Sequence, residues 1–566
     1  MAESSPLQCD LLVIGGGING SGIARDAAGR GLSVILCEQD DLAAHTSSAS
    51  SKLIHGGLRY LQYGELGLVR KALAEREVLM RSAPHLIKPL RFNLPHLPNL
   101  RPAWLLRCGL FLYDHLAPRH LLPGSAAINL QRHVAGSVLA QDLQHGFVYS
   151  DAAVDDARLV ILNALDARER GARILPRTRC SALYTRESSW HASLQTDQGE
   201  LIKVRAACVV NATGAWTLDV LRQAQLPSAR QLRMVKGSHI VVAKLFDHEE
   251  AYIFQHHDGR IVFALPFEQE YTLIGTTDVE YSDDPRRVSI SPEEVSYLCS
   301  ISNRYFRQQI APADVLWSYA GIRPLLDDGS GNAQAVTRDY ELQLDRHEAP
   351  MLSVFGGKIT TYRKLAEDAM NRLAQVIAIP GKAWTEHACL PGGDLLGGSP
   401  SNASALHFDA FVATVQQQYP WLPEKLACRY ARAYGTRLYR MLADCRDLRD
   451  LGSALMPGLH EQELRYLIDH EWARSAHDVL WRRSKLGMQA PTGAYRLIDA
   501  WIQRHLRSVH GCVTGGLHGQ LYPCAGSGND QLARRSVRSA WRHGGQRPAP
   551  DPADIPPERL GGTRSA

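Results

Sequence analysis

The segment "DLLVIGGGINGSG", residues 10–22, constrains the fold of this chain more than any other. A short apolar run at 10–14 predicts a buried parallel strand, and glycines follow it at positions 15, 17 and 20. The helix-like "NGSGIARDAAGRG" and a second strand "LSVILCE", which ends at Glu38, complete a βαβ unit. This G-x-G-x-x-G context predicts a Rossmann-type fold that binds a dinucleotide.

Each glycine of the motif has a physical task. Gly15 permits the tight turn, Gly17 lets the backbone approach a diphosphate, and Gly20 lets the helix pack closely on the strand. The helix N-terminus offers N–H groups and a positive dipole end to the diphosphate. Glu38 is predicted to accept the ribose hydroxyls, and its carboxylate disfavours the 2′-phosphate of NADP.

Length and composition narrow the class of protein. The chain has 566 residues, 45% of them hydrophobic and 21% charged, which fits a soluble globular protein of two or three domains. The formal charge of +5 does not indicate a nucleic-acid partner. None of the eleven cysteines stands at C-x-x-C spacing, so we expect reduced thiols, no metal site and a cytoplasmic setting. The polar start "MAESSPLQC" does not resemble a signal peptide.

Periodicity along the chain predicts an α/β fold in three parts. Residues 1–399 form a Rossmann-type domain, with a mixed-β substrate domain interleaved at about 85–150 and 220–345. Five helical segments at about 400–510 form an all-α C-terminal domain, and the Gly-, Pro- and Arg-rich tail at 511–566 is predicted to be disordered.

No segment reaches the roughly 18 apolar residues that a bilayer span requires. The nearest, Ala103 to Leu116, is interrupted by Arg107 and flanked by Arg101 and Arg119. We interpret it as a buried helix with a basic rim. The alternative is a surface helix that dips into lipid head groups.

Three later features favour FAD over NAD as the dinucleotide. The first is the run "TSSASSKLIHGGLRY" at 46–60, whose hydroxyls and glycines suit a backbone that follows a bound cofactor. The second is the strand end "CVVNATGAW", and the third is "SVFGGKITTYRKL", where a strand meets a helix start that can stabilise negative charge on a reduced flavin. From these segments we predict the following further cofactor ligands: Thr46, Ser47, Ser51, Gly56, Gly57, Ala212, Gly214, Gly356, Gly357 and Thr360.

Together these segments resemble one known family. The match runs in order from about 10 to 510, and the family is that of the aerobic FAD-dependent sn-glycerol-3-phosphate dehydrogenases. The similar segments are "DLLVIGGGINGSGIARDAAGRGLSV", "SSASSKLIHGGLRYL", "VNATGAW", "KGSHIVV", "GTTDVEY", "GIRPL", "TRDY", "SVFGGKITTYRKLAE" and, in the helical C-terminal domain, "YLIDHEWARSAHDVLWRRSKLGM". The resemblance implies oxidation of glycerol 3-phosphate to dihydroxyacetone phosphate, with ubiquinone in the membrane as electron acceptor. It also implies peripheral attachment to the inner face of the cytoplasmic membrane, and it leaves a homodimer possible.

The implied substrate carries a phosphate of about −1.5 to −2 charge, which requires arginine or lysine. The resemblance places five side chains around it, namely Arg59, Tyr60, Arg323, Arg338 and Lys358. The candidates for the chemical step are His239, His55 and, as an electrostatic stabiliser, Arg323. A lone histidine on an apolar strand, such as His239, is as often a core residue, and Asp278 can orient a partner or cap a turn.

Three rival functions stay open at this stage. A glycerol-phosphate oxidase of the same fold would pass electrons to oxygen, and another FAD amine or hydroxy-acid oxidoreductase would not need the four cationic groups. An RNA-binding flavoprotein has only the arginine-rich tail in its favour, without the stacking aromatic side chains that such proteins use.

Overall fold

The computed structural model describes residues 5–97, 101–226, 228–257, 259–327 and 339–513. Residues up to His505 form one compact unit, and a second unit begins at Leu506. Arg338 and the predicted tail beyond residue 513 lie outside the described residues.

The first sheet confirms the predicted Rossmann-type region. Its strand order is β17-β18-β10-β1-β2-β7, and β1 pairs in parallel with both β10 and β2. Residues 11–13 of β1 are fully buried because helices cover one face of the parallel core and an antiparallel hairpin with a short helix covers the other. The strands are β1 (Leu7–Ile14), β2 (Val34–Cys37), β7 (Arg173–Leu175), β8 (Thr178–Arg186), β9 (Ser189–Thr196), β10 (Leu201–Asn211), β17 (Glu341–Asp345) and β18 (Met351–Phe355).

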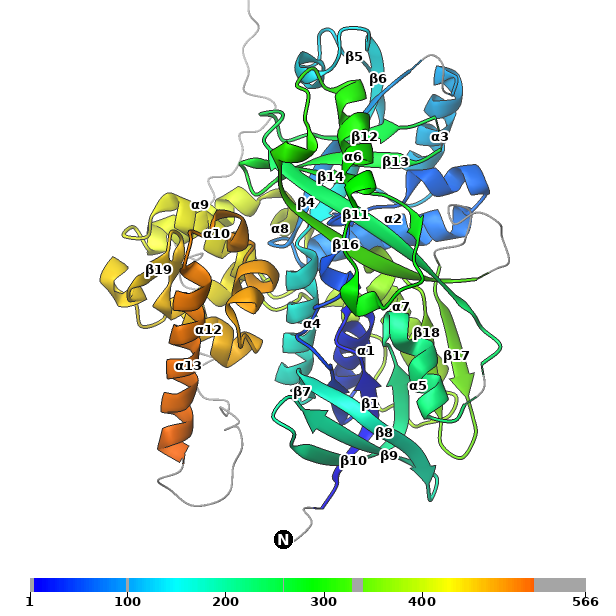
Figure 1. Cartoon of the computed structure of the whole chain (residues 1–566), viewed down its shortest axis with the longest axis vertical. Helices are drawn as coiled ribbons and strands as arrows, with labels where there is room; N and C mark the ends of the chain where they lie inside the picture. Colours follow the sequence, from blue (N-terminus) through cyan, green and yellow to red (C-terminus); the bar gives the residue numbers. More distant parts are fainter. Residues whose placement is uncertain (1–4, 98–100, 227, 258, 328–338, 514–566) are drawn as a thin grey trace, which may run out of the picture. The chain divides into compact units, whose positions relative to one another are not determined.

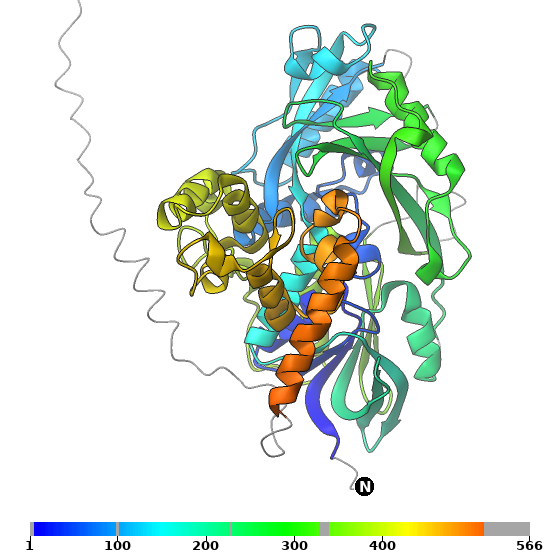
Figure 2. The same ribbon diagram turned by 60° about the vertical axis from the view of Figure 1, so that its left-hand side comes forward.

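The second sheet is the predicted mixed-β region, and Figures 1 and 2 show its green strands at the opposite end of this unit from β1. Its main path is β15-β11-β14-β13-β12-β4-β6-β3; β16 pairs with β11, and β5 pairs with β6. The strands are β3 (Leu53–Ile54), β4 (Ile87–Pro95), β5 (Ala126–Asn129), β6 (His145–Val154), β11 (Leu232–Ala243), β12 (Ala251–Gln255), β13 (Ile261–Phe267), β14 (Tyr271–Gly275), β15 (Val279–Glu280) and β16 (Val315–Leu326).

Helices surround both sheets. Helix α1 follows the glycine turn of the first sheet and packs against α4 and α7. The helices up to residue 373 are α1 (Ile18–Gly29), α2 (Leu66–Ser82), α3 (Ala103–His115), α4 (Asp156–Glu169), α5 (Thr217–Gln223), α6 (Pro292–Tyr305) and α7 (Tyr362–Leu373).

The C-terminal region is helical, as predicted, and lies beside α4 (Figure 1). A small hairpin, β19 (Ala454–Met456) and β20 (Leu459–His460), and a π-helix at Asp478–Arg483 interrupt its α-helices. Those helices are α8 (Asn402–Leu406), α9 (Phe408–Gln418), α10 (Glu424–Tyr434), α11 (Leu438–Met441), α12 (Glu461–Glu471) and α13 (Ala494–Val513).

Helix α3 corrects one prediction, because it is not the buried helix that its apolar sequence suggested. Only Leu110 and Tyr113 are buried, whereas Trp104 is 68% and Phe111 is 58% exposed. The helix packs by one narrow face on the turn at 58–63, so most of its apolar side chains have no core to enter. Among the described helices, none combines the length and the hydropathy that crossing a bilayer requires.

Candidate active site

The glycine turn after β1 is as tight as its sequence predicts. Gly15 has φ +112°, and a β-carbon there would lie 2.5 Å from the carbonyl oxygen of Ala212. A β-carbon at Gly20 would lie 1.9 Å from Gly15 O, so a side chain would force α1 away from β1. A β-carbon at Gly17 would lie 3.0 Å from the hydroxyl oxygen of Ser47. The turn therefore brings backbone N–H groups close to any ligand at the start of α1.

Glu38 closes one side of this turn. Its carboxylate accepts hydrogen bonds from the backbone N–H of Gly16 (2.7 Å) and of Asp40 (2.9 Å). Burial raises the pKa of Glu38, and these two N–H groups offset part of that rise. The carboxylate is held at the glycine turn, where the sequence predicts a ribose ligand.

The segment from Thr46 to Ser51 lies between the glycine turn and the second sheet. The Ser47 hydroxyl accepts from the Ile18 N–H (3.0 Å), and the Thr46 hydroxyl donates to the carbonyl of Ile322 (2.7 Å). Ser51 lies 2.9 Å from Nε2 of His239. Each predicted hydroxyl thus connects two regions that are far apart in the sequence.

The predicted turn at 356–357 also reaches the start of α1. Both glycines have positive φ values, +70° and +99°, and Asn19 of α1 donates to the carbonyl of Gly356 at 3.2 Å. The following segment is a short 3₁₀ turn before α7, and its Thr360 hydroxyl accepts from the His55 N–H (3.2 Å). Two further predicted positions, Gly57 and Gly214, adopt φ +82° and +59°.

These residues fit a large polar cofactor. Within the described residues, Asn19 Oδ1, His239 Nδ1 and Thr361 Oγ1 are buried beside the predicted ligands without a hydrogen-bond partner. Because buried polar atoms normally find partners, they indicate a ligand that supplies them. A cavity of about 600 Å³ adjoins the same segment, and its lining includes Thr46, Ala49, Trp216, Gly321, Trp317 and Trp481. Of these residues only Thr46 is a predicted ligand. Trp216 and Gly321 fall within quoted motifs, whereas Trp317 and Trp481 come from segments that no motif marks.

Four of the five predicted substrate side chains form one group. Arg59 lies 3.3 Å from the Asp278 carboxylate, which Arg323 also contacts. The ammonium of Lys358 lies 3.8 Å from the centre of the Tyr60 ring, and the Arg59 guanidinium lies 5.7 Å from it. Tyr60 thus contributes its ring face to both cations.

The turn that carries Asp278 is itself fixed. Arg323 donates to the Thr276 hydroxyl at 2.8 Å. The Thr277 hydroxyl donates to the buried Glu294 (2.7 Å) and accepts from the Ser238 N–H (2.9 Å). Asp278, which the sequence left open as an orienting residue, therefore joins two of the cations from a rigid position.

The two candidate histidines differ in environment. His239 is 1% exposed and stacks on Tyr319. Burial, followed by the charges of Arg323 and Lys52, lowers the pKa of His239 well below 6.5, so this imidazole is neutral at neutral pH. His55 is half-buried on the loop that leads to Arg59, with its ring edge toward Phe263.

Sequence reasoning missed a buried network behind that loop. Asp151 accepts from the Tyr113 hydroxyl (2.8 Å) and from Arg76 (2.5 Å), and the Gly56 N–H donates to the Tyr113 oxygen at 2.8 Å. Tyr113 belongs to α3, so this exposed helix is bonded to the backbone between His55 and Arg59. No motif links Arg76, Tyr113 and Asp151, because they come from three separate elements.

Comparison with known proteins agrees with this geometry. Residues 10–363 match the family described as FAD dependent oxidoreductase, and residues 383–505 match the C-terminal domain of alpha-glycerophosphate oxidase. The chain therefore belongs to the FAD dependent oxidoreductase family, more particularly to its glycerol-3-phosphate dehydrogenase members, as its resemblance predicted. FAD, the predicted cofactor, is the cofactor of this family.

Individual relatives cover most of the chain. Glycerol-3-phosphate dehydrogenase of Pseudomonas aeruginosa is 53% identical, covering 88% of this chain and 95% of the relative. Aerobic glycerol-3-phosphate dehydrogenase of Escherichia coli is 48% identical, covering 87% of this chain and 97% of the relative. D-erythritol 1-phosphate dehydrogenase of Brucella abortus is 49% identical, covering 86% of this chain and 95% of the relative. Among solved structures, the FAD complex of glycerol-3-phosphate dehydrogenase from Bacillus halodurans has a TM-score of 0.70 at 25% identity and covers 91% of this chain and 97% of its own.

Proposed function

We propose that this protein oxidises sn-glycerol 3-phosphate to dihydroxyacetone phosphate. The oxidation removes a hydride from C2 and a proton from the C2 hydroxyl, which leaves a ketone. The bound FAD supplies the hydride acceptor. The residues of the chain hold the phosphate, orient C2 and take the proton.

The arrangement of charges around Tyr60 carries this proposal. Arg59 and Arg323 both contact the Asp278 carboxylate, and Arg59 and Lys358 both contact the ring of Tyr60. A phosphate monoester of about −1.5 to −2 charge is a ligand that such a group of cations can bind. Guanidinium groups also supply the paired N–H donors that orient a phosphate.

The relatives favour glycerol 3-phosphate over a longer substrate. Those at 53% and 48% identity are named for glycerol 3-phosphate, and the relative at 49% is named for D-erythritol 1-phosphate. Both compounds combine a phosphate with a neighbouring secondary alcohol, so the same cations would serve either one. We place glycerol 3-phosphate first and use the other compound as a comparison substrate.

Replacement of one cation tests the phosphate site. In Arg323→Gln the KM for glycerol 3-phosphate should rise about 10- to 100-fold, because a charge-assisted hydrogen bond contributes roughly 1.5–3 kcal/mol. Steady-state kinetics give the value. Arg304→Gln is the matched control, since this arginine is exposed on α6. An unchanged KM in Arg323→Gln, whatever the change in kcat, would contradict a phosphate-binding role.

We further propose that His55, rather than His239, accepts the proton of the C2 hydroxyl. His55 stays half-buried on the loop that carries Arg59. His239 is enclosed, already pairs with Ser51 and has a strongly lowered pKa, so it is a weak base that fixes the Ser51 hydroxyl. Arg323 would stabilise the developing alkoxide by its positive charge.

The pH dependence of the two histidine variants separates these roles. His55→Gln should lower kcat by about 10²- to 10⁴-fold and remove the acidic limb of the kcat/KM profile, whereas His239→Gln should keep that limb. The stability of His239→Gln should also differ in its pH dependence. The His239 pKa is depressed on folding, so its contribution is complete above pH 6.5 and is lost as the pH falls below that value. An acidic limb that disappears only in His239→Gln would reverse the assignment.

We propose ubiquinone as the electron acceptor and peripheral attachment to the inner face of the cytoplasmic membrane through α3. The exposed apolar side chains of this helix include Trp104, Leu105, Phe111 and Leu112. Two exposed arginines accompany them: Arg101 precedes the helix, and Arg107 lies between Leu105 and Phe111. An apolar face with a basic rim is complementary to an anionic lipid surface, where a quinone is dissolved. The rival oxidase would instead form hydrogen peroxide without added quinone.

A double substitution on α3 tests the attachment. Trp104→Ser with Phe111→Ser should weaken binding to phosphatidylglycerol vesicles by at least about tenfold, because each buried side chain contributes roughly 1.5–3 kcal/mol. Co-sedimentation measures the binding, and Leu316→Ser, at an equally exposed leucine on β16, is the control. Turnover with membrane-bound ubiquinone should fall while turnover with a water-soluble acceptor is kept. Unchanged vesicle binding and quinone turnover would eliminate α3 as the contact.

A further inference from the structure

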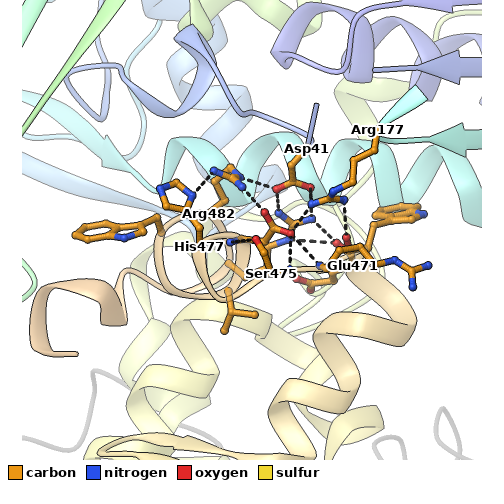
Figure 3. Close-up of polar contacts among 12 residues, drawn as sticks. Asp41, Arg177, Glu471, Ser475, His477 and Arg482 are labelled. Atoms are coloured by element: carbon orange, nitrogen blue, oxygen red, sulfur yellow. Dashed lines mark hydrogen bonds and ion pairs between the residues drawn. The ribbon is translucent and has the colours of Figure 1, made fainter. Parts of the chain in front are cut away.

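A buried cluster of ion pairs joins the helical C-terminal region to the loop that follows Glu38. Asp41 is 4% exposed, and its carboxylate accepts from Arg482 Nε (2.5 Å) and from Arg483 Nη2 (2.9 Å). Figure 3 shows Asp41 between Arg177 and Arg482, with the π-helix below it. Asp41 belongs to the nucleotide-binding region, and the two arginines that hold it are far away in the sequence.

The π-helix presents these arginines in a fixed arrangement. Asp478, at its first residue, contacts Arg177 and Arg482 and accepts from the backbone N–H groups of Arg474 (2.8 Å) and Ser475 (3.0 Å). Burial alone would raise the pKa of Asp478, but the neighbouring arginines lower it to about 2. The carboxylate therefore stays ionised across the physiological pH range.

The cluster continues to the predicted ribose ligand. Residues 38–41 are held on their other side by β-type bonds: Arg177 N–H donates to the Asp40 carbonyl (2.7 Å), and Thr178 N–H donates to the Glu38 carbonyl (2.6 Å). The Glu38 side chain is bonded in turn to Gly16 N–H at 2.7 Å. A continuous set of contacts thus connects Arg482 and Arg483 with the glycine turn.

We propose that Asp41, Arg482 and Arg483 are positioning residues for the adenosine end of the FAD site. The helical region would then be a working part of the cofactor site rather than an appended domain. Burying the four charged side chains of Asp41, Asp478, Arg482 and Arg483 costs free energy that apolar contacts would avoid, which suggests a requirement beyond simple adhesion of two regions. The inference depends on FAD as the cofactor and not on the proposed substrate.

Affinity for the adenosine half of the cofactor tests this proposal. In full-length Asp41→Asn, which keeps the side-chain shape, the Kd for FAD and that for ADP as a competitor should each rise about tenfold. Flavin fluorescence measures both values. Because ADP lacks the flavin ring, weaker ADP binding locates the defect at the adenosine end.

Glu463→Gln is the matched control. Glu463 is fully buried and bonds to Arg429 (2.7 Å) and Tyr434 (2.6 Å), so this variant disturbs an ion pair wholly within the helical region. Its Kd values for FAD and ADP should stay within about twofold of the parent. If Asp41→Asn folds poorly, Arg483→Gln, which leaves Arg482 in place, is the second variant, and its Kd values for FAD and ADP should also rise. Equal losses of affinity in the Glu463→Gln control, or unchanged ADP binding in both cluster variants, would overturn the proposal.

Discussion

The close approach of backbone to backbone at the glycine turn is the constraint on which the site depends. No β-carbon fits at Gly15 or Gly20, so β1 and α1 meet at a distance that only glycine allows. Three other segments of the predicted cofactor site are bonded to that turn or to the start of α1. Ser47 bonds to the start of α1, Glu38 to Gly16 and Asn19 to the late turn at Gly356. The predicted FAD site would occupy the space that these contacts leave around the N-terminus of α1.

The substrate side is organised by charge rather than by backbone shape. Asp278 links Arg59 with Arg323, and the ring of Tyr60 lies against Arg59 and Lys358. The loop of His55 and Arg59 is also bonded through Gly56 to Tyr113 of α3. In the proposed function, the helix that contacts lipid and the loop that holds the substrate would therefore share one buried hydrogen-bond network, which is consistent with an enzyme that delivers electrons to a membrane quinone.

Much of this could be predicted from local sequence patterns. The period of apolar residues and the glycine spacing predict the first βαβ unit, and the motifs near 46–60, 212–214 and 356–360 predict segments that do converge. The apolar composition of α3 could not reveal which face is covered, because that depends on the contacts that Leu110 and Tyr113 make with segments distant in the sequence. The ion cluster at Asp41 could not be predicted either. Its members at 41, 177 and 482 share no sequence motif and come together only in the folded chain.

One spectrum tests the central claim most directly. Purified protein with its FAD is mixed anaerobically with glycerol 3-phosphate, and the visible flavin absorption is followed, with D-erythritol 1-phosphate and glycerol as comparison compounds. The account predicts rapid bleaching by glycerol 3-phosphate, weaker bleaching by the longer phosphate and none by glycerol, which lacks the charged group that the three cations bind. A flavin that stays oxidised with glycerol 3-phosphate, or that glycerol bleaches equally well, would contradict it.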